Sequence, residues 1–268
     1  MVVGITRSRD EADIIESSIR RMLEQVDRIV IGDNSDDGTR EILDALAVEH
    51  PGRVDVRWDD APSVAQRDVM TQYARDAAAD GAEWVVPFDI DEVWQSDRAT
   101  IRHRLASLGS EILLAPARLV THCCTTLDDQ SDPDPLSRMV WRDVEMLPLP
   151  KMACRARPDV VIEHGNHGAR FERVKVPPAA LGLMSARHFP YRSAEQFIHC
   201  VEIAWPQLRD SGLPETHGAH IWAYGRTLDE RGPDGLRAVF NEHWLVDAPA
   251  QRGRVHDPLP RVRLSLTA

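Results

Sequence analysis

Apolar residues in the first hundred positions follow two spacings in turn. Short apolar segments, typical of buried strands, occur at residues 2–5, 29–31, 54–58 and 84–88. Between them, apolar residues recur three or four positions apart, which predicts helices over residues 12–26, around 42–47 and over 65–79. Strands that alternate with helices predict an α/β fold of the doubly wound type, with a mostly parallel central sheet flanked by helices.

The pattern is less regular beyond residue 100. Strands are predicted at residues 112–114, 151–157 and 160–162. Residues 127–136 are rich in Asp, Pro and Ser and predict a mobile surface loop, which is either a lid over a ligand or a plain connector.

Four regions follow from these patterns. Residues 1–100 and 101–193 are expected to be two halves of one domain. Residues 194–246 show helical spacing, and residues 247–268, rich in Arg and Pro, predict an extended tail.

Composition narrows the class of protein. The 268 residues are 43% hydrophobic and carry a net charge of -11, which argues against a broad nucleic-acid-binding surface. The four cysteines lack metal-finger spacing and are expected to be reduced. No apolar run reaches membrane-spanning length and the start predicts no signal peptide, so a cytoplasmic location is expected.

The segment 84–94 ends its apolar run in carboxylates. Asp89 and Asp91 follow the predicted strand at its carboxyl end, where ligands bind in open α/β sheets. Two neighbouring carboxylates suit a hard divalent cation, and the alternative is an acidic turn in which Asp91 caps a helix. The first predicted loop, residues 6–9, lacks the G-x-G-x-x-G pattern, which argues against a nicotinamide or flavin enzyme.

Four features in order resemble the family 2 glycosyltransferases, which have the GT-A fold. The first is a Thr-Arg loop after the first predicted strand, with the acidic pair Asp10-Glu11, and the second is the segment Asp33-Asn34-Ser35-Asp36-Asp37-Gly38-Thr39 after the second predicted strand. The third is Arg67, on the helix before the fourth predicted strand, and the fourth is the D-x-D motif Asp89-Ile90-Asp91. The resemblance covers residues 1–100 well and continues loosely through residues 165–167 and 188–193.

This resemblance implies a GT-A-type nucleotide-sugar-binding fold in which residues 1–100 form the donor half and residues 101–193 the acceptor and catalytic half. Asp91 would contact Mn²⁺ or Mg²⁺, and Asp89 would lie near the ribose and reach the metal directly or through water. Asp33 would accept a hydrogen bond from the base of a UDP-, GDP- or TDP-sugar. Thr6 and Arg7 would flank the base and ribose, and Arg67 would face base or phosphate.

Later residues could complete this site. GT-A enzymes can supply a late histidine to the metal or diphosphate, for which His188 is our first candidate and His167 the second. Ser193 and Gln196 form a predicted capping box, so His188 comes just before a helix, and Arg192 in the same turn is a candidate for the diphosphate.

The sequence does not identify the residue that acts as general base. An inverting transfer needs a carboxylate near the acceptor hydroxyl, which the family often supplies from an E-D pair. That pair is missing here, and the candidates are Asp143, Glu145 and Glu163, each of which could equally be a surface carboxylate.

The expected function is metal-dependent transfer of a sugar from a nucleoside diphosphate to an acceptor hydroxyl, with inversion. Two alternatives remain: a nucleotidyltransferase, disfavoured because residues 6–9 contain no glycine, and a binding or scaffold protein with a degenerate GT-A fold. Neither the sugar, the acceptor nor the oligomeric state follows from the sequence.

Overall fold

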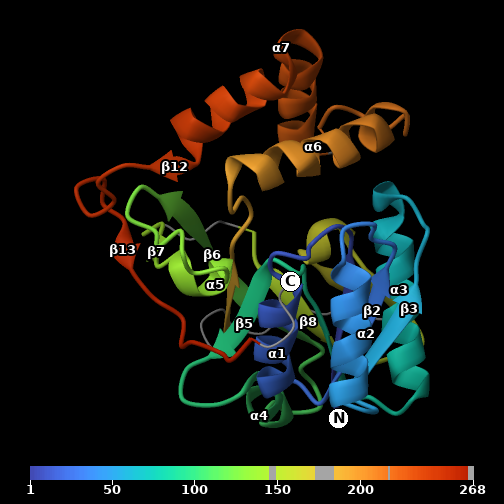
Figure 1. Cartoon of the computed structure of the whole chain (residues 1–268). Coiled ribbons are helices and arrows are strands. Elements are labelled where there is room, and N and C mark those ends of the chain that lie inside the picture. Colours follow the sequence, from blue (N-terminus) through green and yellow to red (C-terminus); the bar gives the residue numbers. More distant parts are fainter. Residues whose placement is uncertain (145–148, 173–183, 217, 265–268) are drawn as a thin grey trace.

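The computed structural model describes residues 1–144, 149–172, 184–216 and 218–264. Within them one mixed sheet of eleven strands forms the centre of the molecule, with the order β13-β7-β6-β8-β4-β1-β2-β3 (Figure 1). Strands β11 and β12 also pair with β6, and β5 pairs with β11. The predicted α/β fold with a helical C-terminal part is confirmed.

The first part of the chain forms the parallel half of the sheet. Its elements are β1 (Val2–Ser8), α1 (Ile15–Gln25), β2 (Arg28–Asp33), α2 (Thr39–Glu49), β3 (Val54–Trp58), α3 (Gln66–Ala79) and β4 (Trp84–Pro87). Strand β1 is three residues longer than predicted because Thr6 to Ser8 pair in register with the end of β2. The buried polar side chains of Thr6 and Ser8 therefore lie at the carboxyl edge of the sheet.

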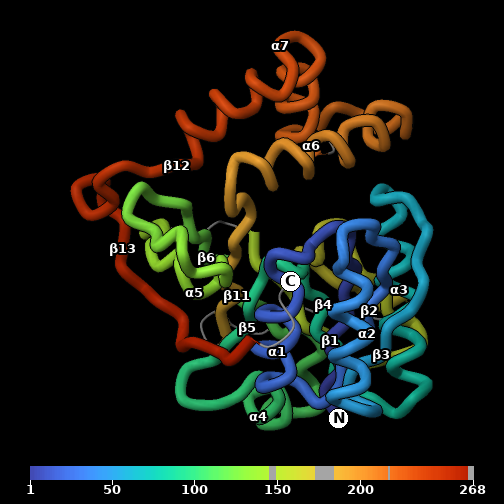
Figure 2. Tube along the Cα trace, in the orientation of Figure 1, coloured from blue at the N-terminus to red at the C-terminus, as the bar shows by residue number. Residues whose placement is uncertain are grey.

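Two apolar layers lie on opposite faces of this half, as the period of two in a strand requires. Ile29 and Ile31 of β2 pack with α1 and α2, whereas Val30 between them packs with residues of α3. Helices α1 and α2 therefore cover one face of the sheet and α3 the other (Figure 2).

The middle of the chain adds antiparallel neighbours. Its elements are β5 (Glu92–Ser96), α4 (Ile101–Ala106), β6 (Leu114–Thr125), α5 (Pro135–Arg138), β7 (Trp141–Arg142), β8 (Lys151–Arg155), β9 (Val160–Ile162), β10 (Ala169–Phe171) and β11 (Met184–His188). The strand predicted at 112–114 begins only at Leu114 and extends to Thr125. The segment 127–136 is more enclosed than a surface loop, because Asp128, Asp134 and Leu136 are buried.

The C-terminal part contains α6 (Ala194–Arg209) and α7 (Ala219–His243), followed by the short strands β12 (Leu245–Val246) and β13 (Val255–His256). Helices α6 and α7 pack on each other and lie beyond one end of the sheet (Figure 1). The chain then returns to α1, where Leu259 is buried and Arg21 donates a hydrogen bond to the carbonyl of Pro260. Among the described residues, no helix has the length and apolar character to cross a membrane.

Candidate functional site

The Asp-Ile-Asp motif forms the turn between β4 and β5. The turn is closed by a hydrogen bond of 2.9 Å from the Glu92 amide to the Asp89 carbonyl. Phe88 and Ile90 are buried in the core, whereas the side chains of Asp89 and Asp91 keep 33% and 19% of their surface exposed. The two apolar residues therefore anchor the turn and leave both carboxylates at the sheet edge.

Pairing of β5 with β11 brings His188 to this turn from almost a hundred residues away. His188 lies opposite Glu92 in the antiparallel register, and the Phe189 amide donates to the Asp91 carbonyl at 2.8 Å. The Nε2 atom of His188 is 3.2 Å from Oδ2 of Asp91. One ligand atom each of Asp91, Glu92 and His188 lies within 4.8 Å of the other two.

The charges of this acidic–histidine cluster (Asp91, Glu92 and His188) are mutually adjusted. Burial acts to raise the pKa of Asp91, but the attraction and hydrogen bond of His188, together with the charges of Arg192 and Lys151, outweigh it and lower that pKa to about 2. Burial acts to lower the pKa of His188, and the partner Asp91 raises it above its ordinary value. Each side chain of the pair thus favours the charged form of the other.

Glu92 is the buried member of the cluster. Burial, with a contribution from Asp89, raises the pKa of Glu92 to about 7 against the opposing effect of Lys151. When Glu92 is ionised, Lys151 balances its negative charge, because the Lys151 ammonium lies 2.8 Å from Oε1 of Glu92.

Lys151 joins the turn to two other elements. Its ammonium also lies 2.6 Å from Oδ2 of Asp89 and donates to the Gly165 carbonyl at 2.7 Å. Burial acts to lower the pKa of Lys151, but Asp89 and Glu92 together raise it well above its ordinary value. Three oxygen atoms therefore lie within 2.8 Å of the ammonium nitrogen, two of them as hydrogen-bond acceptors.

Asp89 is held from the other side as well. Its Oδ1 atom accepts hydrogen bonds from Asn166 at 2.8 Å and from Gln66 at 3.3 Å. With Lys151 on Oδ2, both oxygens of Asp89 are engaged within the chain.

The acidic–histidine cluster fits a divalent cation. Two carboxylates and one imidazole form a donor set that suits Mn²⁺, and carboxylates also suit Mg²⁺. Nδ1 of His188 is buried and has no hydrogen-bond partner among the described residues. Asp91, Glu92 and His188 are thus the residues that would hold the ion, with Asp89 directed to Lys151.

A cavity of about 310 Å³ lies at the carboxyl ends of the first strands. The described residues around it come from β1 and the loop after it, from the loops after β2 and β3, from α3 and from α6; they include Arg7, Ser8, Glu11, Asn34, Gln66 and Gln207. Helix α6 contributes one wall, and Oε1 of Gln207 accepts from the Ser63 amide at 2.8 Å. Because Gln66 lines the cavity and also bonds to Asp89, it links this space to the Asp-Ile-Asp turn.

Asp33, the last residue of β2, is buried next to Asn34 of the cavity lining. Its Oδ1 atom accepts hydrogen bonds from Ser8 at 2.7 Å and Ser35 at 2.6 Å. Its Oδ2 atom is buried and has no partner among the described residues. An acceptor is therefore left over at the position from which a base could be recognised.

The other residues predicted to bind the nucleotide differ in their surroundings. Thr6 is buried. Arg7 lines the cavity and is held by Asp59 at 2.7 Å and by the Ala61 carbonyl at 2.5 Å. Arg67, at the start of α3, has a buried Nε without a partner in the described parts of the chain.

Arg192 is engaged by carboxylates. It contacts Glu11 at 2.5 Å and Asp13 at 2.7 Å, and it is almost fully buried. Burial raises the pKa of Glu11 to about 8, although Arg192 opposes the shift. Arg192 therefore ties the start of α6 to the loop after β1. A role at the diphosphate would require it to exchange one of these partners.

The second histidine and the base candidates lie in separate environments. His167 contacts the Pro150 carbonyl through Nδ1 at 3.2 Å, and burial lowers its pKa. Asp143 forms an ion pair with Arg254, and Glu163 forms one with Arg170 at 2.8 Å. Neither Asp143 nor Glu163 belongs to the acidic–histidine cluster, and Glu145 lies outside the described residues.

Three residues of the site were missed in the sequence. Glu92 directly follows Asp91 but lies outside the D-x-D motif. Lys151 is one of two lysines in an arginine-rich chain, and this rarity is the only local signal for it. Gln66 carries no signal, since its role depends on where α3 meets the turn.

No protein-family model matches the chain, and no curated protein matches it. Solved structures show distant likenesses. The mannosyltransferase PcManGT from Pyrobaculum calidifontis, in complex with GDP-Man and Mn²⁺, is 17% identical with a TM-score of 0.36, over 90% of this chain and 75% of that chain. HddC from Yersinia pseudotuberculosis is 13% identical with a TM-score of 0.30, over 46% of this chain and 60% of that chain.

The galactosyltransferase LgtC, in complex with donor and acceptor sugar analogs, is 14% identical with a TM-score of 0.28, over 44% of this chain and 46% of that chain. Likenesses at such TM-scores carry no argument about function. The fold class rests on the sheet topology and on the helices that cover it.

Proposed function

We propose that this protein is a metal-dependent glycosyltransferase that moves a sugar from a nucleoside-diphosphate sugar to an acceptor hydroxyl. The observation that carries the proposal is the position of the acidic–histidine cluster next to the cavity at the carboxyl ends of β1 to β3. Gln66 belongs to the wall of that cavity and to the hydrogen-bond network of the turn. A base and ribose in the cavity would place a diphosphate toward the cluster.

The chemistry of each side chain indicates its role in the proposed site. Asp33 offers its free Oδ2 to a donor on the base, and Arg67 offers an unpaired guanidinium nitrogen to base or phosphate. Asp91, Glu92 and His188 would hold Mn²⁺ or Mg²⁺. When bound, the cation supplies Lewis-acid stabilisation of the leaving diphosphate.

The transfer exchanges one bond for another. The bond between the anomeric carbon and the diphosphate oxygen breaks, and a bond from that carbon to the acceptor oxygen forms. The acceptor proton passes to a carboxylate within hydrogen-bond reach. Glu145 remains a candidate for that carboxylate, and Asp143 or Glu163 would first have to leave its arginine.

Nucleotide binding provides the first test. We expect UDP, GDP or TDP to raise the melting temperature in the presence of Mn²⁺ and to have a smaller effect without it. At a hundred times Kd the gain is about 2.7 kcal/mol, or about 5 °C for a chain of this size. Asp91→Asn should abolish the metal-dependent part, whereas the exposed Asp234→Asn should retain it. If no nucleotide shifted the transition with either metal, the donor site would be refuted.

Product analysis separates the enzyme classes. A glycosyltransferase releases a nucleoside diphosphate from the sugar nucleotide, even when water replaces the acceptor, whereas a nucleotidyltransferase releases pyrophosphate from a nucleoside triphosphate as it joins the nucleotide to a sugar 1-phosphate. We expect slow release of the diphosphate by the parent protein and by Asp234→Asn, with loss in Asp91→Asn. Nucleotide binding without release of either product would instead indicate a binding or scaffold protein.

A further inference from the structure

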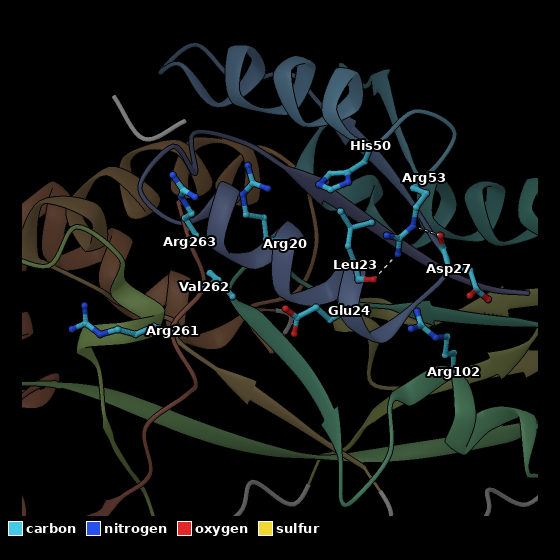
Figure 3. Close-up of a pocket in the computed structure, with 10 residues that line it drawn as sticks. All are labelled: Arg20, Leu23, Glu24, Asp27, His50, Arg53, Arg102, Arg261, Val262 and Arg263. Carbon is cyan, nitrogen blue, oxygen red and sulfur yellow. Dashed lines mark hydrogen bonds between the residues drawn. The ribbon is translucent and has the colours of Figure 1, made fainter. Parts of the chain in front are cut away.

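A second cavity lies far from the candidate donor site. Its volume is about 720 Å³, and five arginines line it: Arg20, Arg53, Arg102, Arg261 and Arg263 (Figure 3). Asp27, in the same wall, accepts a hydrogen bond of 2.7 Å from the amide of Val2, the first residue of β1. The donor-site cavity includes Ser8 at the other end of that strand, which is about 20 Å away for seven extended residues.

The lining of this basic cavity has a net positive charge, opposite in sign to the charge of the whole protein. Five arginines face two carboxylates, Glu24 and Asp27, whereas the whole chain carries a net charge of -11. A positive site in an acidic protein is selective, since it attracts a small anion while the remaining surface repels a large polyanion. The basic cavity therefore favours a small anionic ligand over nucleic acid.

Two of the arginines are held in place without losing their charge. Arg53 donates to the carbonyls of Leu23, Val26 and Asp27 at 2.6, 3.1 and 3.0 Å, and Arg102 donates to the Val26 carbonyl at 3.2 Å. These carbonyls lie at the C-terminal end of α1, where cations are favoured. Because carbonyls carry no net charge, both guanidinium groups remain positive.

Their fixed positions lower the entropy cost of binding. Arg53 retains Nη1, and Arg102 retains Nε and Nη2, for donation to a ligand.

A third charge comes from the other end of the chain. Arg263 lines the cavity and forms no ion pair with a described residue. Its segment is fastened to α1, because Arg21 donates to the Pro260 carbonyl and Leu259 is buried. By contrast, Arg20 is already paired with Glu16 and Glu49, and Arg261 with Asp132. Arg53, Arg102 and Arg263 are therefore the cations left for an anion.

The carboxylates of the cavity indicate a second kind of group on the ligand. Glu24 lies on α1 within the same cavity and forms no hydrogen bond to a described residue (Figure 3). Guanidinium groups grip phosphate bidentately, whereas a free carboxylate accepts hydrogen bonds from hydroxyl groups. The volume lies in the range of ligand pockets and far exceeds that needed for one phosphate ion.

We propose that the basic cavity binds a phosphorylated, hydroxyl-rich ligand, with the phosphate on Arg53 and Arg102 and hydroxyls on Glu24, while Arg263 adds positive charge at the opposite end of the cavity (Figure 3). Such a group occurs in free sugar phosphates and in the phosphorylated inositol headgroup of a lipid. This site is independent of the donor site, and it adds a second ligand to the protein.

Isothermal titration calorimetry with glucose 6-phosphate tests the proposal. We expect saturable binding that weakens by about tenfold or more in Arg102→Gln/Arg263→Gln. Arg263→Gln alone should weaken binding to a smaller extent, because Arg263 acts by its charge from the opposite end of the cavity, and it removes no hydrogen bond or ion pair to a described residue. Arg118→Gln/Arg252→Gln changes the net charge equally at exposed positions outside the cavity and should retain the parent affinity. Asp91→Asn should retain it too, which separates this site from the donor site.

Three results would overturn the proposal. They are no saturable binding of glucose 6-phosphate at millimolar concentration, equal weakening in the matched control, and equal affinity for inorganic phosphate, which would show an adventitious ion only.

Vesicle sedimentation separates the two sources of the ligand. Phosphatidylcholine vesicles that contain phosphatidylinositol 4-phosphate are compared with vesicles of the same charge that contain phosphatidylserine. Selective sedimentation with the first, lost in Arg102→Gln/Arg263→Gln, would assign the lipid headgroup. Binding of glucose 6-phosphate without vesicle binding would assign a free sugar phosphate.

Discussion

The ammonium nitrogen of Lys151 lies 2.6 Å from Oδ2 of Asp89, so the first carboxylate of the Asp-Ile-Asp turn is neutralised within the chain. The second carboxylate, Asp91, faces His188 instead. The two aspartates thus differ in their partners although they are two residues apart. Asp89 connects the turn to β8, α3 and the segment at Asn166, whereas Asp91 is the carboxylate of the acidic–histidine cluster with the better access to a ligand.

Removal of the Lys151 ammonium should destabilise the protein. In Lys151→Met the carboxylate of the fully buried Glu92 loses its cation, and breaking a buried ion pair costs about 3–5 kcal/mol. Urea unfolding should show a loss of that order, compared with a small change in the exposed Arg118→Met.

The double variant Lys151→Met/Glu92→Gln identifies the cause. It should recover about 1 kcal/mol or more relative to the sum of the single changes, because the uncompensated charge is gone. Strict additivity would contradict the coupling between these two residues.

Asp91 should control the titration of His188. Burial acts to lower the pKa of His188 and the charge of Asp91 raises it, so Asp91→Asn leaves burial as the larger influence. We expect the pKa of His188, followed by NMR in the metal-free protein, to be above 6.5 in the parent and to fall in Asp91→Asn. An unchanged titration would show that the pair seen at 3.2 Å does not persist in solution.

His122 should make the protein sensitive to acid. Its ring is stacked on Phe189 at 4.3 Å, and burial lowers its pKa from 6.5 to about 4 despite a hydrogen bond to the Met139 carbonyl. Between pH 6.5 and 4 the unfolded chain takes up a proton at this residue that the folded protein does not. The free energy of unfolding should therefore fall as the pH is lowered, by about 3 kcal/mol in total from this group.

The comparison with His122→Gln isolates that contribution. The difference in unfolding free energy between parent and variant should change by about 3 kcal/mol from pH 7 to pH 4. His103→Gln, at an exposed position, serves as the control. A constant difference between parent and His122→Gln would refute the burial of a neutral imidazole.

Gly225 should be required for the packing of α7 on α6. A Cβ atom at this position would overlap the indole ring of Trp205. We expect Gly225→Leu to destabilise the protein by about 3 kcal/mol or more, because overpacking at a helix contact forces the backbone apart. Ala223→Leu places the same side chain on the exposed face of the same helix and should have little effect. Equal unfolding midpoints for the two variants would contradict the packing.

The local pattern of the sequence determined most of the first hundred residues. Strand β3 has the predicted bounds, and helices α1 and α3 lie within the predicted ranges. A strand or helix that is buried on one or two of its faces has apolar residues at a regular spacing, and this spacing is visible among neighbouring residues of the sequence. The same reasoning places Asp89 and Asp91 at the end of β4, since apolar residues must end where the strand leaves the core.

Only the tertiary structure decided what these carboxylates meet. His188 reaches Asp91 through pairing of β5 with β11, and Lys151 reaches Asp89 from β8. Which strands pair depends on the packing of the whole sheet, and it cannot be predicted from the spacing of apolar residues two to four positions apart. The basic cavity has the same origin, because Arg53, Arg102 and Arg263 line one cavity only after the C-terminal segment returns to α1.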